Sequence, residues 1–177
     1  MIAVVMGARF TRTDYERLPE GFPAQLVRGT LVKEPSPTYG HQRLVHLLLE
    51  RLSACVGRDR VVPAPMDVGL DDHNVYQPDI LVAHDDTLTE RHLAHPPALA
   101  VEILSPSSRS VDLVRKRAAY ERAGLDHPVV VEPLLPAVTV LARVGRRLVE
   151  VAAAKGDEPL AVERPFPVTV VAADLVA

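Results

Sequence analysis

Two short segments near the middle of the chain, residues 78–83 and 98–104, are apolar at nearly every position. A strand with one solvent-exposed face alternates apolar and polar residues, whereas a strand covered on both faces is apolar almost throughout. Residues 128–132 have the same character. The three segments therefore predict a central sheet with helices packed against both of its faces.

Two longer segments have the apolar spacing of helices. Over residues 39–56, apolar side chains recur at intervals of three and four positions: Leu44, Leu47, Leu48, Leu52 and Val56. Residues 111–123 are also expected to be helical, because Gly124 follows them at the position of a C-terminal cap.

Short elements are expected on either side of these segments. A helix is predicted over residues 14–18, with Thr11 or Thr13 as its N-terminal cap. Hairpins are predicted over residues 25–33, turning at Arg28-Gly29, and over residues 138–151, turning at Gly145-Arg146.

Residues 60–70 alternate loosely and contain two prolines, so they predict one strand at a sheet edge or with a bulge. Residues 167–171 predict a last strand. The order of elements predicts the α/β class, with a central mixed sheet between helices. Since domains have roughly 100–200 residues, we expect a single domain over residues 1–177.

Composition and charge exclude several classes of protein. With 20 Lys and Arg against 23 Asp and Glu, the net charge of −3 excludes a uniformly basic nucleic-acid-binding surface but permits a local basic strip. The single cysteine, Cys55, excludes an intramolecular disulfide and a cysteine zinc site, and we expect it to be buried at a helix end. The N-terminus lacks the basic region of a signal peptide, and no apolar stretch approaches the roughly 18 residues that span a bilayer. We therefore expect a cytoplasmic protein.

One acidic residue interrupts each of the first two apolar segments: Asp79 and Glu102. A buried carboxylate costs several kcal/mol unless it is compensated. Either acid alone is readily explained as a strand-end residue that reaches solvent or an arginine. Two such acids on neighbouring strands also fit a divalent cation bound between them, and carboxylate oxygens suit Mg²⁺ or Mn²⁺.

The predicted helix over residues 111–123 carries Asp112, Lys116 and Tyr120 on one face, because they are spaced by four positions. Taken alone, Asp112 and Lys116 predict an ordinary surface ion pair of about 0.3–0.5 kcal/mol. The helix follows Glu102 after a short turn, however, so its start is expected near the two acids.

Four segments together resemble a known family: EPSPTYGHQ at 34–42, YQPDILV at 76–82, PALAVEILSPS at 97–107 and DLVRKRAAYERAG at 112–124. They are similar to the Uma-type restriction endonuclease family of the PD-(D/E)xK nuclease superfamily. The resemblance covers roughly residues 11 to 142. It implies a restriction-endonuclease-like fold, with three α/β/α layers around a central mixed sheet.

The resemblance also implies a catalytic centre. Asp79 and Glu102 match the metal ligands, and the implied cofactor is Mg²⁺ or Mn²⁺. The lysine of the superfamily signature ordinarily stands two positions after the glutamate, where this chain has Leu104; the Uma-type pattern has a lysine on the following helix, which matches Lys116. The implied reaction is metal-dependent hydrolysis of a DNA phosphodiester, with Lys116 orienting the attacking water or neutralising charge.

Further residues are candidates for substrate binding: His41, Gln25, Arg115 and Tyr120. Positive charge is concentrated around the predicted helix in four arginines: Arg109, Arg115, Arg117 and Arg122. They fit an approaching phosphate as well as an ordinary solvated face. DNA is thus the implied partner, and homo-oligomerisation is expected because cutting both strands often uses two copies of one site.

The chain departs from the family pattern at two places. Family members usually carry an acid in the first hairpin, where this chain has Gln25, and residues 126–133 read DHPVVVEP in place of an aromatic-rich strand. These departures favour an alternative, a weakened or inactive relative that binds DNA or a protein. A second alternative is a metal-dependent hydrolase of a smaller phosphoester.

Overall fold

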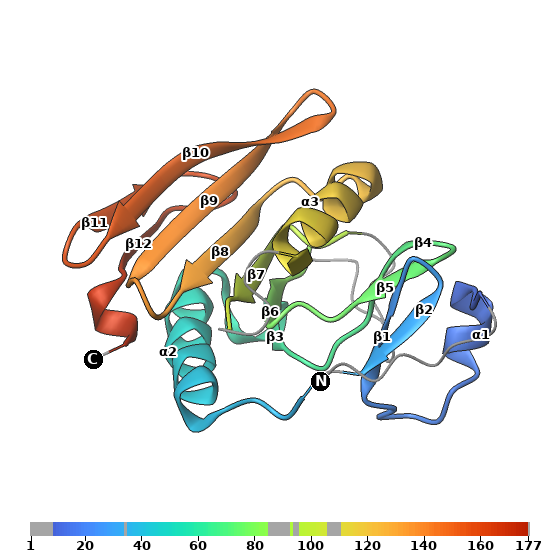
Figure 1. Cartoon of the computed structure of the whole chain (residues 1–177). Helices are drawn as coiled ribbons and strands as arrows, with labels where there is room; N and C mark the ends of the chain where they lie inside the picture. Colours follow the sequence, from blue (N-terminus) through green and yellow to red (C-terminus); the bar gives the residue numbers. More distant parts are fainter. Residues whose placement is uncertain (1–8, 34, 85–92, 94–95, 106–110, 177) are drawn as a thin grey trace.

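The structure of the protein is a computed structural model (Figure 1). Its centre is a mixed six-stranded sheet. The structure describes residues 9–33, 35–84, 93, 96–105 and 111–176, without the side chains of residues 111–113 and 115. The spatial order of the strands is β10-β9-β8-β7-β6-β3. Their bounds are β3 Val61–Pro63, β6 Ile80–Val82, β7 Leu99–Ile103, β8 Pro128–Glu132, β9 Ala137–Val144 and β10 Arg147–Lys155. Only β7 and β8 run parallel within this sheet.

Two smaller sheets flank the central one. A four-stranded sheet has the order β2-β1-β5-β4, and β11 pairs with β12 in a two-stranded sheet. The bounds are β1 Ala24–Val27, β2 Thr30–Lys33, β4 Val68–Asp71, β5 Asn74–Tyr76, β11 Pro159–Val162 and β12 Val168–Val171. In Figure 1 the four-stranded sheet lies to the right of the central sheet, next to the short helix α1 (Arg12–Glu16).

The helices α2 (Tyr39–Val56) and α3 (Val111–Ala123) cover opposite faces of the central sheet. Alternate residues of β7 point to opposite faces, so Val101 packs in the same core as Leu48 of α2, whereas Ala100 packs with Ala119 of α3. This confirms the predicted three-layer α/β/α architecture. The remaining helical segments are the 3₁₀ turns η1 (Arg58–Arg60) and η2 (Ala173–Leu175).

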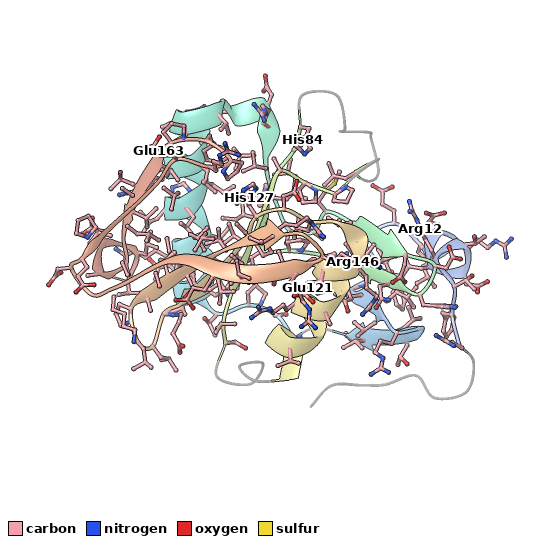
Figure 2. All side chains as sticks on the ribbon, turned by 90° about the horizontal axis from the view of Figure 1, so that it is seen from above. Arg12, His84, Glu121, His127, Arg146 and Glu163 are labelled. Atoms are coloured by element: carbon pink, nitrogen blue, oxygen red, sulfur yellow. The ribbon has the colours of Figure 1, made fainter. Side chains whose placement is uncertain are left out.

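The β9–β10 hairpin holds the C-terminal part of α3 in place. A guanidinium nitrogen of Arg143 on β9 donates to the carbonyls of Tyr120, Glu121 and Leu125 at 3.2, 3.1 and 3.2 Å. The Glu121 carboxylate accepts from the Leu148 N–H of β10 at 2.9 Å. Figure 2 shows Glu121 beside this hairpin, whose turn carries Arg146. The position of α3, and of the residues it carries, is therefore set by the sheet.

Most predicted elements are confirmed. The helices over 39–56 and 111–123 have the predicted bounds, and Thr11 caps α1 in a capping box with Asp14. The hairpins turn at Arg28-Gly29 and at Gly145-Arg146, as expected. Among the described residues, no helix is both long and apolar enough to cross a membrane.

Several predictions are wrong. Residues 60–70 form two strands, because Pro63 and Pro65 have no N–H to continue a ladder; β3 belongs to the central sheet and β4 to the four-stranded one. Strands β5 and β11 were not expected, and α1 begins at Arg12 because its cap is Thr11, two residues earlier than predicted. Cys55 is exposed, since it lies on the outer face of α2, where its thiol donates to the Arg51 carbonyl at 3.3 Å.

Substitution of Leu44 by alanine should show the contribution of α2 to the core. Leu44 is 2% exposed, whereas Leu134, in a turn, is 61% exposed. We expect Leu44→Ala to lower the free energy of unfolding by about 2–5 kcal/mol. The control Leu134→Ala should change it by less than about 0.5 kcal/mol in equilibrium urea unfolding. Equal losses in the two variants would contradict this account of the core.

Candidate active site

Glu102 lies near the end of β7, a strand of the central sheet that is buried along its whole length. All five residues of β7 are buried, and Glu102 itself is 7% exposed. Its position in the pleat directs the side chain to the face that α3 covers. There the Lys116 ammonium lies 2.7 Å from Oε2, and the Tyr120 hydroxyl donates to Oε1. Both carboxylate oxygens of Glu102 therefore have partners from α3.

The electrostatics of this group follow from its burial. Burial raises the pKa of the Glu102 carboxyl above its usual value, the nearby Lys116 ammonium lowers it, and the negative charge of Asp79 raises it. The hydrogen bonds from Lys116 and Tyr120 also lower this pKa. Burial and the neighbouring Glu102 carboxylate raise the pKa of the Tyr120 hydroxyl. The hydroxyl thus stays protonated and remains a hydrogen-bond donor to Glu102.

Asp79 stands just before β6 and reaches the end of β7. Its Oδ2 accepts a hydrogen bond from the Ile103 backbone N–H at 2.7 Å, one residue beyond Glu102. Its Oδ1 lies 3.0 Å from Nε2 of His41, in the first turn of α2. The side chains of Asp79 and His41 are 21% and 20% exposed, so this pair is accessible to solvent. The Asp79 carboxylate therefore lies beside the backbone that follows Glu102 at the end of β7, and its charge acts on the Glu102 carboxyl.

Gln25, a predicted substrate-binding residue, lies in the four-stranded sheet. It is 1% exposed on β1, and its Oε1 accepts a hydrogen bond from the Gln77 N–H at 3.1 Å. The Gln77 side chain donates in turn to Asp67 at 2.9 Å. These bonds fix the segment that leads from β5 to Asp79. Gln25 thus connects the four-stranded sheet to the chain that enters the central sheet at Asp79. Its predicted contact with substrate stays a prediction.

Tyr76 is a residue of this region that the sequence did not single out. It is 1% exposed, and its ring meets that of Tyr120 edge to face, with the centroids 6.0 Å apart. Its hydroxyl donates to Oδ1 of Asn74 at 3.2 Å. Aromatic residues make up only 4% of the chain. An aromatic residue three positions before Asp79 is therefore unusual, and this is the one signal that could have identified Tyr76.

The predicted residues of α3 have different surroundings. Lys116 and Tyr120 both contact Glu102; Tyr120 thus positions the acid, a role that the sequence did not suggest, and its predicted substrate contact stays a prediction. Arg117 is turned to β10, where it donates to the Leu148 carbonyl and lies 3.7 Å from Glu121. The arginines expected on this helix therefore do not form one continuous strip. Arg109 and the side chains of Asp112 and Arg115 lie outside the described residues.

The donor set fits a hard divalent cation. Within the described part of the chain, no three His, Cys, Asp or Glu side chains are grouped closely enough to enclose a metal by themselves. Mg²⁺ does not require such a cage, because it commonly binds one or two carboxylates and keeps several waters. Asp79 and Glu102 are two carboxylates close enough for the charge of one to act on the other. A cation at Glu102 would compete with the Lys116 ammonium for the same carboxylate.

The chain matches the model of a known protein family. A family model described as Uma2, putative restriction endonuclease, matches residues 12–174. The chain belongs to the Uma2 family. This confirms the resemblance that the four sequence segments indicated. No curated protein matches this chain.

Among solved structures, this Uma2 protein is similar to a crystal structure of a putative nuclease belonging to DUF820 from Anabaena variabilis. The TM-score is 0.71 at 19% sequence identity, and the similarity covers 94% of this chain and 97% of that one. Because so little of the sequence is identical, the comparison shows the fold. It confirms the predicted restriction-endonuclease-like fold class.

The pairing of Lys116 with Glu102 can be tested in the presence of a chelator. Lys116→Met leaves Glu102 buried without its cation, so we expect a loss of about 3–5 kcal/mol in the free energy of unfolding. Glu102→Gln combined with Lys116→Met should recover most of this loss, since no buried charge remains. Because the pKa of Glu102 is raised from 4.5, the stability of Lys116→Met should increase as the pH falls toward that value.

The matched control is Lys155→Met, which removes an exposed lysine at the end of β10. It should leave the free energy of unfolding unchanged within about 0.5 kcal/mol. Equal effects of the two lysine substitutions would show that the ion pair contributes nothing to the fold.

Proposed function

We propose that this protein is a divalent-cation-dependent DNA endonuclease that hydrolyses phosphodiester bonds. Membership of the Uma2 family supports nuclease activity in general. The observation that carries the proposal is that two acids and one helix lysine are neighbours: Asp79 accepts a hydrogen bond from the backbone one residue beyond Glu102, and Lys116 lies 2.7 Å from Glu102. Two carboxylates and an ammonium in this arrangement suit metal-assisted attack on a phosphate.

Asp79 and Glu102 would hold the cation, with Mg²⁺ or Mn²⁺ as the cofactor. Such an ion, when bound, polarises the phosphate and lowers the pKa of a coordinated water. The protein side chains prepare this site. The Ile103 N–H and His41 orient Asp79, while the Tyr120 hydroxyl orients Glu102.

Lys116 has a separate role in the proposed reaction. Its ammonium compensates the buried Glu102 charge. A cation held by Asp79 and Glu102 would share this compensation, and the ammonium would then also be placed to stabilise negative charge on the phosphate. The proposal therefore assigns catalysis to Asp79, Glu102 and Lys116, with His41 and Tyr120 as positioning residues.

A second candidate function has a specific observation in its favour. Gln25 is neutral at the position where family members usually carry an acid, and both oxygens of Glu102 already have protein partners. These features fit a weakened or inactive relative that acts as a DNA- or protein-binding module. Hydrolysis of a smaller phosphoester, homo-oligomerisation and a cytoplasmic location stay predictions from the sequence.

Cleavage of plasmid DNA with Mg²⁺ or Mn²⁺ tests the proposed activity. We expect wild type to cut, and Asp79→Asn to lose about a hundredfold or more of the rate. Lys116→Arg should lose activity while it keeps a charge beside Glu102 and therefore the fold. The control Glu163→Gln removes an exposed acid after β11 and should cut like wild type. Unaltered cutting by Asp79→Asn would exclude this centre as the active site.

Gln25→Glu tests whether the missing acid weakens cation binding. A third carboxylate near Asp79 and Glu102 should raise the affinity for Mn²⁺ by on the order of tenfold, measured by calorimetry without DNA. The control Gln42→Glu adds the same charge on the exposed face of α2 and should leave the affinity unchanged. If both variants bind Mn²⁺ like wild type, Gln25 does not limit the site.

A further inference from the structure

A cavity of about 610 Å³ lies between the turns of two hairpins and the exposed face of α3. Ligand pockets in proteins commonly have volumes of about 300–1,000 Å³. Three arginines line it: Arg9 from the segment before α1, Arg28 from the β1–β2 turn and Arg122 from α3. Its apolar wall comes from Tyr76, Val114 and Ala118.

The cavity is separated from the proposed active site by a pair of aromatic rings. Tyr76 lines the cavity, and its ring packs edge to face on Tyr120, whose hydroxyl binds Glu102. Lys116 of the active site and Arg122 of the cavity both act electrostatically on the Tyr76 hydroxyl. A ligand in the cavity would therefore lie across the Tyr76–Tyr120 pair from Glu102.

One of the two acidic residues that line the cavity, Asp71, is engaged in the turn between β4 and β5. Asp71 accepts hydrogen bonds from the Asn74 amide at 2.8 and 2.9 Å and from the His73 N–H at 2.8 Å. Asp72 and His73 also line the cavity. Within the described part of the chain, Arg9, Arg28 and Arg122 form no salt bridges. The three guanidinium groups thus outnumber the two carboxylates and are not neutralised by them.

Arg28 occupies a backbone conformation that disfavours a residue with a side chain. Its φ is +53°, and that of Gly29 is +80°, the pattern of a two-residue hairpin turn that normally selects Asn, Asp or Gly. The turn is held from outside, because the Arg28 N–H donates to Asn74 Oδ1 at 2.9 Å and the Gly29 N–H to the His73 carbonyl at 2.8 Å. An arginine kept in a disfavoured conformation at the rim of a cavity points to a role in binding.

We propose that this cavity binds the sugar-phosphate backbone of the DNA strand beside the bond to be cleaved. The planar guanidinium groups match phosphate oxygens in geometry and charge, and the apolar wall suits the deoxyribose. The inference rests on the proposed function and extends it, because it names the surface along which the strand is held. Arg28 and Arg122 are the principal phosphate contacts.

Fluorescence anisotropy of a short labelled DNA duplex in a chelating buffer tests the cavity without cleavage. We expect Arg28→Asn and Arg122→Gln each to weaken binding about tenfold. Each should also reduce the slope of log affinity against log salt by about 0.9, the value for one lost phosphate contact. Arg28→Asn should not lower the melting temperature, since Asn accepts this turn conformation. An unchanged melting temperature would show that Arg28→Asn weakens DNA binding without unfolding the protein.

The control Arg146→Gln removes an exposed arginine from the β9–β10 turn (Figure 2) and should bind DNA like wild type. Unchanged binding in both cavity variants, or no binding by wild type at low salt, would overturn the proposal. Tighter binding of inorganic phosphate than of the duplex, measured by calorimetry, would assign the cavity to a free anion and would also overturn it.

Cleavage assays separate this proposal from the proposed function. If the cavity variants lose DNA binding while wild type never cuts with Mg²⁺ or Mn²⁺, the cavity proposal stands and the endonuclease proposal fails. If the variants bind like wild type and wild type cuts, the endonuclease proposal stands and the cavity proposal fails.

Discussion

The ion pair between Glu102 and Lys116 is the constraint on which the rest of the site depends. A carboxylate on a strand whose residues are all buried would destabilise the sheet unless a cation and hydrogen bonds compensated it. Here the compensation comes from α3, through Lys116 and Tyr120. The packing of α3 on the sheet therefore also determines how the charge of Glu102 is compensated. A helix displaced from β7 would leave a buried charge behind.

Other parts of the fold serve the same arrangement. Arg143 and Glu121 connect α3 to the β9–β10 hairpin, so the helix has its own contacts with the sheet besides those to Glu102. On the other side, Gln25 fixes the chain that leads into Asp79. Three layers and both larger sheets thus meet at the two acids.

Much of the local structure could be predicted, because its causes are local. The periodic leucines of residues 39–56 and the capping glycine after residue 123 determined the bounds of both long helices. The strand over 60–70 was predicted wrongly. Its prolines interrupt the ladder, but which sheet each half joins depends on later pairing: β3 pairs with β6, and β4 joins the first hairpin through β5, whose Val75 pairs with the distant Leu26.

The sequence by itself determined the class of fold, the family, and the two acids and the lysine as candidates for chemistry, because strand pattern, helix pattern and motif order are written in consecutive residues. Only the tertiary structure decided which atoms meet. It paired His41 with Asp79, gave both oxygens of Glu102 partners from α3, and set Tyr76 between the acids and a cavity lined by arginines. These contacts join residues from separate elements, and their distances follow from the packing of layers, which no local pattern specifies.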